Sequence, residues 1–312
     1  MATADLLTAS KHFTLERLAD GVYAAIENTG FGAFSNAGFV DLGDRTLVFD
    51  SFQTPQAAQD LRAAAEQLTG KPVSILVNSH RHGDHVRGNQ VFRDAVILST
   101  ELTRELIGQD RARVAQQRDG IHGYHASLPA KVEAAQTEEE RRALEMQLSQ
   151  IGEICETIDT LELTLPTVTF SEQLVIHGTK RRAELFCFGG GHSPSDTFLY
   201  LPEEKIVFFA DLLFTSGHLA VWEDAREWHR ILTRVQEEFA MDVLVPGHGS
   251  VGTREDLAKN LRYLEVFLQT IEEGKARGLS EDELQKLPIP EELAGLAYPN
   301  NWASSLRVQA VK

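Results

Sequence analysis

A histidine-rich segment follows the apolar run Val73–Val77, and its side chains are of the kinds that bind metal ions. The segment reads Asn78-Ser79-His80-Arg81-His82-Gly83-Asp84-His85. Neutral imidazole and carboxylate groups suit zinc, and also iron or manganese. His80 and His82 are two residues apart, so they point the same way if the backbone is extended. The aspartate and the last histidine come after Gly83, where the chain can bend toward a second point. One short loop can therefore serve two metal ions; the alternative is a polar surface loop.

Three further side chains of the same kinds follow strand-like segments. His192 comes after Ala183–Phe188 and three glycines. Asp211 ends the uniformly apolar run Ile206–Ala210, where a carboxylate is costly unless it is paired or bound to a cation. His248 lies between two glycines directly after the last strand-like run. The sequence therefore places each candidate ligand at the end of a predicted strand.

The order of these motifs resembles the metallo-β-lactamase superfamily over roughly residues 22–250. The loop pattern HxHxDH comes first and the three downstream residues follow in the family's order. The resemblance implies one metal ion on His80, His82 and His192, a second on Asp84, His85 and His248, and Asp211 as the bridge between them. It also implies that Asp50, at the end of an upstream strand, supports the histidine-rich loop. The alternative for Asp50 is a plain polar residue at a strand end.

The implied cofactor is a pair of divalent metal ions, zinc first, with iron or manganese as alternatives. A water held by such cations loses a proton near neutral pH, with a pKa of about 7 at one zinc ion. Asp84 should accept a hydrogen bond from the bridging hydroxide, which makes it the expected catalytic residue. Aspartate at position 211, where the familiar zinc β-lactamases carry cysteine, resembles the family's hydrolases of thioesters, lactones and phosphodiesters. We therefore expect a dinuclear hydrolase that cleaves an ester-like bond in a small molecule.

Other activities of the same family, and one without catalysis, are alternatives. An iron-dependent oxidoreductase of the persulfide dioxygenase type holds one iron, and retention of His85 and His248 argues against it. Phosphodiesterase activity or weak promiscuous cleavage of β-lactams is compatible with the ligands. A non-catalytic binding module would be expected to lack ligands, and every ligand position is filled here. A count of bound metals separates the hydrolase from the single-iron enzyme.

Composition narrows the partners of the 312-residue chain. The net charge of −16 argues against nucleic acid, because phosphate binding needs clustered Lys and Arg. No apolar run approaches the ~20 residues of a membrane span. Met1–Ser10 lacks the basic start and apolar core of a secretory signal, and two cysteines make no disulfide framework. We expect a cytoplasmic protein that takes a small-molecule substrate, with no nucleic acid or membrane partner; a homodimer through the helical insertion described next is left open.

Alternating and apolar runs separated by turn residues predict the order of the elements. The sequence indicates a strand meander from residue 13 to 50, a helix capped by Thr54, and the strand Val73–Val77, which Pro72 opens. A helical insertion at about 101–158 follows, in which Thr137 and Glu140 form a capping box. A second strand set includes Thr197–Leu201 and precedes an amphipathic helix at Ala225–Glu238 with Trp228, Leu232 and Val235 on one stripe. In the C-terminal helical extension at about 254–312, Trp302, Leu306 and Val308 predict that the segment packs against the rest of the chain. The resemblance implies an α/β (α+β) class, namely a four-layer αβ/βα sandwich in which two mixed sheets pack face to face. We expect residues 1–312 to form a single domain.

Four further residues are candidates for the substrate site or for support of the ligands. Phe34 and Asn36 belong to a glycine- and aromatic-rich segment, which is either a mobile hairpin over the site or an ordinary packed loop. Tyr124 lies in an apolar–polar stretch that either donates a hydrogen bond to substrate or ties down a loop. His218 either lines the pocket or stabilises a loop.

Overall fold

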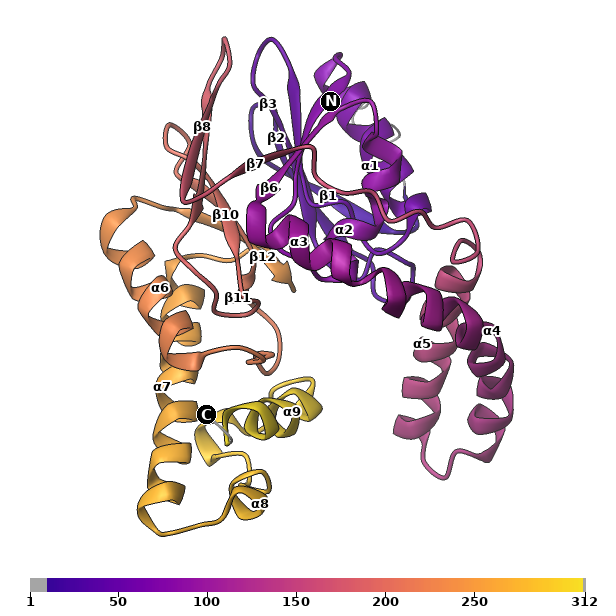
Figure 1. Cartoon of the computed structure of the whole chain (residues 1–312), viewed down its shortest axis with the longest axis vertical. Coiled ribbons are helices and arrows are strands. Elements are labelled where there is room, and N and C mark those ends of the chain that lie inside the picture. Colours follow the sequence, from indigo (N-terminus) through magenta and orange to yellow (C-terminus); the bar gives the residue numbers. More distant parts are fainter. Residues whose placement is uncertain (1–9, 311–312) are drawn as a thin grey trace. The chain divides into compact units, whose positions relative to one another are not determined.

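The computed structural model describes residues 10–310, which fold into two compact units (Figure 1). Unit 1 contains the described residues up to Phe170 together with 178–180; unit 2 contains 171–177 and the residues from Arg181 onward. The expectation of no secretory signal concerns residues that lie, but for Ser10, outside this range. No helix within residues 10–310 combines the length and apolar character needed to cross a bilayer. The single-domain assignment of residues 1–312 stays a prediction.

A seven-stranded mixed sheet forms the centre of unit 1. Its strands, in spatial order, are β1 (Phe13–Ala19), β2 (Val22–Glu27), β3 (Ala37–Asp41), β4 (Thr46–Phe49), β5 (Val73–Val77), β6 (Val96–Thr100) and β7 (Val168–Phe170). The first four strands pair antiparallel, as the predicted meander requires, and the remaining pairs are parallel. Gly21 and Gly43 adopt positive φ in the two tight turns of the meander. The parallel strands leave β5 in the interior of the sheet, so the histidine-rich loop begins at a buried strand end.

Helix α1 (Pro55–Thr69) packs on this sheet through an alanine-rich face. Thr54 caps it, because its hydroxyl accepts a hydrogen bond from the amide of Ala57 at 3.3 Å, and Gly70 ends it in a left-handed conformation. Leu61 of this face is fully buried with side chains of β3 and β4. The helix thus fixes the strands that deliver Asp50 and the metal loop.

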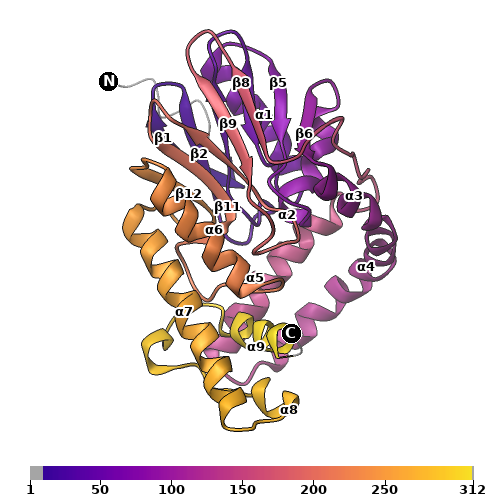
Figure 2. The ribbon, with the colours of Figure 1, turned by 60° about the vertical axis from the view of Figure 1, so that its left-hand side comes forward.

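The predicted helical insertion consists of three helices in unit 1: α3 (Glu101–Gln109), α4 (Arg111–Ala134) and α5 (Glu138–Cys155). Helices α4 and α5 lie side by side as a hairpin (Figures 1 and 2). Thr137 caps α5 as predicted, accepting a hydrogen bond from the amide of Glu140 at 3.1 Å. Helix α4 runs through the stretch around Tyr124, for which tying down a loop was one expected role, so this stretch is helical like the rest of the predicted insertion. The helix-forming residues on both sides outweigh the cost of Gly120 and Gly123, which is about 1 kcal/mol each.

Unit 2 holds a five-stranded sheet and the C-terminal helices. The strands, in spatial order, are β12 (Val243–His248), β11 (Ile206–Phe214), β10 (Thr197–Leu201), β9 (Arg182–Cys187) and β8 (Gln173–His177). Only β11 and β12 pair in parallel among these strands. Helix α6 (Ala225–Glu238) buries Trp228, Leu232 and Val235, the stripe that its periodicity predicts. Two sheets with flanking helices place the described chain in the predicted mixed α/β class.

Strand β11 extends beyond its predicted end. The apolar run was expected to stop at Ala210, but the strand continues to Phe214 and so contains Asp211. Ala210 has a φ of 47°, and the pairing with β12 shifts register on both sides of it. This bulge re-aims the strand, and the apolar residues after it resume the pairing. Asp211 is therefore held by a ladder on either side rather than by a loop.

The C-terminal segment packs against unit 2, as its apolar residues predict. After α7 (Arg254–Ala276), the chain forms α8 (Glu281–Leu284), a short 3₁₀ turn and α9 (Pro299–Gln309) (Figure 2). Trp302 and Leu306 of α9 are buried in the cluster that also contains Phe267 and Leu264 of α7. Helix α9 is consequently a part of the unit 2 core.

Candidate metal centre

Asp50 organises the histidine-rich loop of unit 1. Its fully buried carboxylate follows β4 and accepts hydrogen bonds from the Ser79 amide at 2.8 Å and the Ser79 hydroxyl at 2.8 Å. It also accepts one from Nδ1 of His85 at 2.7 Å. Burial raises the pKa of the Asp50 carboxyl, and the hydrogen bonds from His85 and Ser79 act in the opposite direction. A buried carboxylate with three donors is satisfied as the anion.

This network decides which nitrogens of two histidines can bind a metal. Ser79 gives its only hydroxyl proton to Asp50, so it accepts a hydrogen bond from Nδ1 of His80, at 2.9 Å. Nδ1 of His85 donates directly to Asp50. In both rings Nε2 is then left with a lone pair, which is the tautomer that a metal ligand needs.

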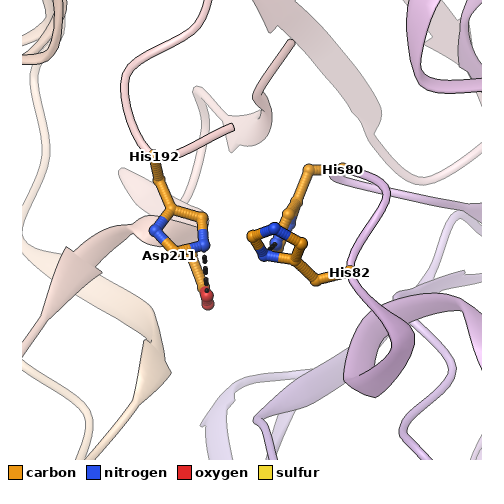
Figure 3. A group of neighbouring side chains, drawn as sticks. All are labelled: His80, His82, His192 and Asp211. Atoms are coloured by element: carbon orange, nitrogen blue, oxygen red, sulfur yellow. Dashed lines mark hydrogen bonds and ion pairs between the residues drawn. The ribbon is translucent and has the colours of Figure 1, made fainter. Parts of the chain in front are cut away.

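His80 and His82 present their nitrogens to the same point. Nε2 of His80 lies 2.9 Å from Nδ1 of His82, and Figure 3 shows the two rings meeting edge to face. Two ligand nitrogens at about 2.0–2.1 Å from a tetrahedral zinc ion are about 3.3 Å apart. The spacing of this pair therefore fits two ligands of one ion after a small adjustment.

In unit 2, the two oxygens of Asp211 face two different histidines. Oδ2 lies 3.0 Å from Nε2 of His192, and Oδ1 lies 3.4 Å from Nε2 of His248 (Figure 3 shows the first pair). Nδ1 of His192 donates to the carbonyl oxygen of Ala220 at 3.0 Å, so Nε2 of His192 carries a lone pair. A lone pair and a carboxylate oxygen at 3.0 Å repel each other unless a proton or a cation lies between them. The arrangement of these three side chains thus fits a carboxylate that bridges two cations.

The glycine-rich loop before His192 is shaped by Asp196. The buried carboxylate of Asp196 accepts hydrogen bonds from the amides of Gly191, His192 and Ser193, at 2.8, 2.9 and 3.0 Å. Burial raises the pKa of Asp196, and the hydrogen bonds from these amides oppose the rise. A Cβ at Gly191 would lie 2.7 Å from the Trp228 side chain, so this position has room for glycine only. The hydrogen bonds to Asp196 and the close packing of Gly191 against Trp228 together set the direction of His192.

Asp84 and His85 lie in the short helix α2 (Gly83–Val86) that follows the loop. Oδ2 of Asp84 is 3.6 Å from Nε2 of His85, and the carbonyl oxygen of Asp84 accepts a hydrogen bond from Ser35 at 2.6 Å. Asn36, next to Ser35, is buried and accepts a hydrogen bond from the Glu27 amide at 3.0 Å. Asn36 therefore ties its own loop to β2 (Val22–Glu27).

Two of the substrate-site candidates have structural surroundings in unit 1. Phe34 is partly buried and packs against a cluster that includes Val114 and Ile121 of α4, which matches the packed-loop alternative. Tyr124 is exposed on α4, with the Lys131 ammonium 4.7 Å from the centre of its ring. Their roles toward a substrate stay predictions.

His218 lies in the core of unit 2, with 1% of its surface exposed. Its Nδ1 is 3.0 Å from the Tyr263 hydroxyl, and its ring contacts Trp302 with centroids 6.1 Å apart. Burial lowers the pKa of His218, because the charged imidazolium loses its hydration there. These contacts match the alternative in which His218 stabilises a loop.

We expect His218 to make stability fall on acidification. Above its unfolded pKa of 6.5, the imidazole is neutral in both states and contributes no pH dependence. As the pH falls below 6.5, the unfolded chain gains a proton that the folded chain does not, so the free energy of unfolding drops by up to about 1.4 kcal/mol per pH unit. Denaturant unfolding of wild type and His218→Asn from pH 8 to about 5 measures this. The difference in the free energy of unfolding between wild type and His218→Asn should narrow below pH 6.5. A difference that stays constant with pH would contradict the presence of a neutral His218 in the folded protein.

Several residues around the ligands were not singled out from the sequence. Ser79 links Asp50 to His80, and Asn89 exchanges two hydrogen bonds with Asn78, at 2.9 and 2.8 Å. Asn78 and Ser79 directly precede His80, and this position in the sequence is the signal that could have identified both as residues that support the ligands. The carbonyl oxygen of Ala220 has no such signal, because every residue carries one.

The family model described as "Metallo-beta-lactamase superfamily" matches residues 30–250, which is more than half of the chain. The chain belongs to the metallo-beta-lactamase superfamily. This confirms the resemblance read from the HxHxDH loop and the residues that follow it. The His and Asp side chains described above are of the kinds that could hold a metal ion in such a protein.

Individual relatives in this superfamily are distant. The linear primary-alkylsulfatase of Pseudomonas sp. is 24% identical over 281 residues, which is 82% of this chain and 50% of the relative. The metallo-beta-lactamase type 2 of Bacteroides fragilis is 23% identical over 113 residues, covering 35% of this chain and 45% of the relative. The chain thus spans about half the length of these curated relatives.

A solved structure confirms the fold. The metallo-beta-lactamase from Pontibacter korlensis has a TM-score of 0.60 and 17% identity, and the match covers 81% of this chain and 99% of that one. At this identity the likeness concerns the fold and not the activity. The predicted α/β class of the metallo-β-lactamase type is therefore correct.

We expect Asp50→Asn to weaken metal binding by about 10- to 100-fold, the usual effect of losing a group that orients metal ligands. The amide cannot accept hydrogen bonds from Ser79 and His85 at both of its side-chain atoms, so one ligand loses its orientation. Competition with a fluorescent chelator measures the affinity. Unchanged affinity in a folded variant would show that Asp50 does not set the ligands.

Proposed function

We propose that this protein is a dinuclear metal-dependent hydrolase that cleaves an ester-like bond in a small molecule. The observation that carries the proposal is Asp211, whose two oxygens face Nε2 of His192 and Nε2 of His248. A carboxylate between two imidazoles in this way suits a bridge between two cations. The proposed ligand set has one ion on His80, His82 and His192, a second on Asp84, His85 and His248, and Asp211 on both.

The residues of the chain have distinct tasks in the proposed reaction. Two bound divalent ions would supply Lewis-acid activation of a water and of the substrate oxygen that gains negative charge. Asp84 would accept a hydrogen bond from the attacking water and so direct its lone pair at the scissile bond. Asp50 and the Ala220 carbonyl keep the imidazoles that they contact neutral and oriented. The donor set of five histidines and two aspartates favours zinc, with iron or manganese as alternatives.

The proposed substrates contain a bond between an acyl, phosphoryl or sulfuryl group and an oxygen or sulfur leaving group. Lactones, thioesters and phosphodiesters are the classes implied by the resemblance of Asp211 to the family's hydrolases of such substrates. The alkylsulfatase relative, which aligns with 82% of this chain, adds sulfate esters to the classes to be tested. The net charge of −16 disfavours nucleic acid as the phosphodiester.

The proposal is tested by counting metals and assaying the same preparation. The full chain is stripped with a chelator, reloaded with zinc, iron or manganese, and assayed on lactone, thioester, phosphodiester, alkyl sulfate and β-lactam substrates. Two metals per chain with metal-dependent hydrolysis of any ester-like class support the proposal. One iron per chain with oxygen consumption would replace it with the single-iron oxidoreductase. Absence of metal-dependent turnover on every class would overturn it.

The setting of the protein is also a proposal. We propose a cytoplasmic, reducing environment, which is supported by the free state of both Cys155 and Cys187. The homodimer is tested by light scattering of the purified chain at micromolar concentration.

A further inference from the structure

One tryptophan of unit 2 is exposed beside a proposed metal ligand. The chain has three tryptophans, and Trp228 and Trp302 are buried, at 0% and 2% exposed. Trp222 is 41% exposed, and its ring centre lies 5.4 Å from that of His192. An indole held at the surface next to a ligand histidine costs hydrophobic free energy that an apolar partner would recover.

The segment that carries this indole, residues 218–225, also orients His192. Nδ1 of His192 donates to the carbonyl oxygen of Ala220 at 3.0 Å, and the Trp222 amide donates to the same oxygen at 3.2 Å. The direction of the His192 ring and the position of the Trp222 backbone thus depend on one carbonyl group. A displacement of the segment would move both.

Helix α9 holds this segment along its length. Four of its side chains bond to the segment: Asn301 Nδ2 donates to the His218 carbonyl at 3.0 Å, Ser304 Oγ accepts from Trp222 Nε1 at 3.4 Å, Ser305 Oγ accepts from the Val221 amide at 2.9 Å, and Gln309 Nε2 donates to the Glu223 carbonyl. Ser305 is fully buried and Gln309 nearly so, so these bonds form in a packed interface. Helix α9 lies beyond residues 30–250, the part that matches the family model. The support of Trp222 is accordingly a feature of this chain's C-terminal extension.

We propose that Trp222 is a specificity-determining residue that contacts an alkyl or aryl group of the substrate beside His192, and that α9 positions it. The proposal rests on the proposed hydrolase function. A flat apolar ring adjacent to the ligand would select substrates whose apolar group lies close to the scissile bond. Ser304 Oγ accepts the hydrogen bond of the indole N–H, the only polar donor of that ring, and so limits the orientations that the ring can take.

The kinetic test compares two esters of one leaving group, an acetyl and an octanoyl ester, on the metal-loaded full chain. Trp222→Ala is expected to raise KM for the octanoyl ester about 10-fold more than for the acetyl ester, in line with the effect of lost apolar contacts on specificity. Trp222→Phe should restore most of this preference. Ser304→Ala should change the KM ratio in the same direction, because the indole loses its fixed orientation. The control Met146→Ala removes another exposed apolar side chain, from α5, and should leave the ratio unchanged.

A binding measurement separates failure of this proposal from failure of the hydrolase function. Octanoate and acetate are titrated into metal-loaded protein while acrylamide quenching of tryptophan fluorescence is recorded, since Trp222 is the exposed indole. Protection of the fluorescence from quenching by octanoate and not by acetate supports the contact even if no ester is hydrolysed. This protection should be absent in Trp222→Phe, which has no indole at this position. Equal effects of Trp222→Ala on both esters, or loss of bound metal in that variant, would overturn it, because either result describes a purely structural role.

Discussion

Asp211→Asn is expected to lower kcat/KM by on the order of 10³-fold, because a bridging ligand supports several kcal/mol of transition-state stabilisation and each 1.4 kcal/mol is a factor of ten. The asparagine amide keeps the shape of the side chain but lacks the negative charge that faces both His192 and His248. Bound metal should fall from two ions to one or fewer per chain. Elemental analysis after gel filtration and steady-state kinetics on the best substrate measure the two effects.

The matched control for this variant is Asp242→Asn, which makes the same change at an exposed carboxylate of unit 2. Asp242 forms a surface ion pair with Lys205 at 3.5 Å, and such pairs contribute little to stability. Activity and metal content should stay at the wild-type level in the control. Full metal occupancy in Asp211→Asn would show that Asp211 is not a metal bridge.

Gly247→Ala is expected to weaken metal binding without replacing any of the proposed ligand residues. A Cβ at Gly247 of β12 would lie 1.8 Å from Oδ1 of Asp211 and 2.8 Å from the Asp211 amide nitrogen. Because the neighbouring backbone is paired in the sheet, the Asp211 carboxylate has to turn away from His248. We expect kcat/KM to fall by about 10²- to 10³-fold, close to the effect of losing the ligand itself, with a destabilisation of about 1–3 kcal/mol from overpacking.

Circular dichroism, thermal unfolding and elemental analysis of Gly247→Ala distinguish these effects. The control is Gly123→Ala in α4, where a Cβ meets no atom within 4 Å and alanine should stabilise the helix by about 0.5–1 kcal/mol. If Gly247→Ala binds two metals as tightly as wild type, the position of Asp211 does not decide occupancy.

Local signals in the sequence were sufficient for several of the strands and helices. The apolar runs Val73–Val77 and Thr197–Leu201, and the amphipathic stretch Ala225–Glu238, give the observed bounds of β5, β10 and α6. Their ends are marked by residues with a direct backbone effect, such as Pro72 before β5 and the capping Asp224 before α6. Periodicity and capping are local, so they can be read without the fold.

The errors occurred where distant residues decide the local structure. Asp211 was placed after its strand, because the continuation of β11 depends on its pairing with β12. The stretch around Tyr124 was given a loop-tying role as one alternative, whereas α4, packed against α5, runs through it. The tautomers of His80 and His192 could not be predicted either. That of His80 depends on the Ser79 hydroxyl donating to Asp50, 29 residues away, and that of His192 on a backbone carbonyl 28 residues away.

The position of Asp50 has a consequence for how metals would leave the protein. One carboxylate orients His85 directly and His80 through Ser79, and these two histidines are proposed to bind different ions. Protonating or removing that carboxylate would loosen both cations at once. Chelator titrations of Asp50→Ala should therefore show both ions bound more weakly than in wild type, rather than one ion weakened and the other unchanged.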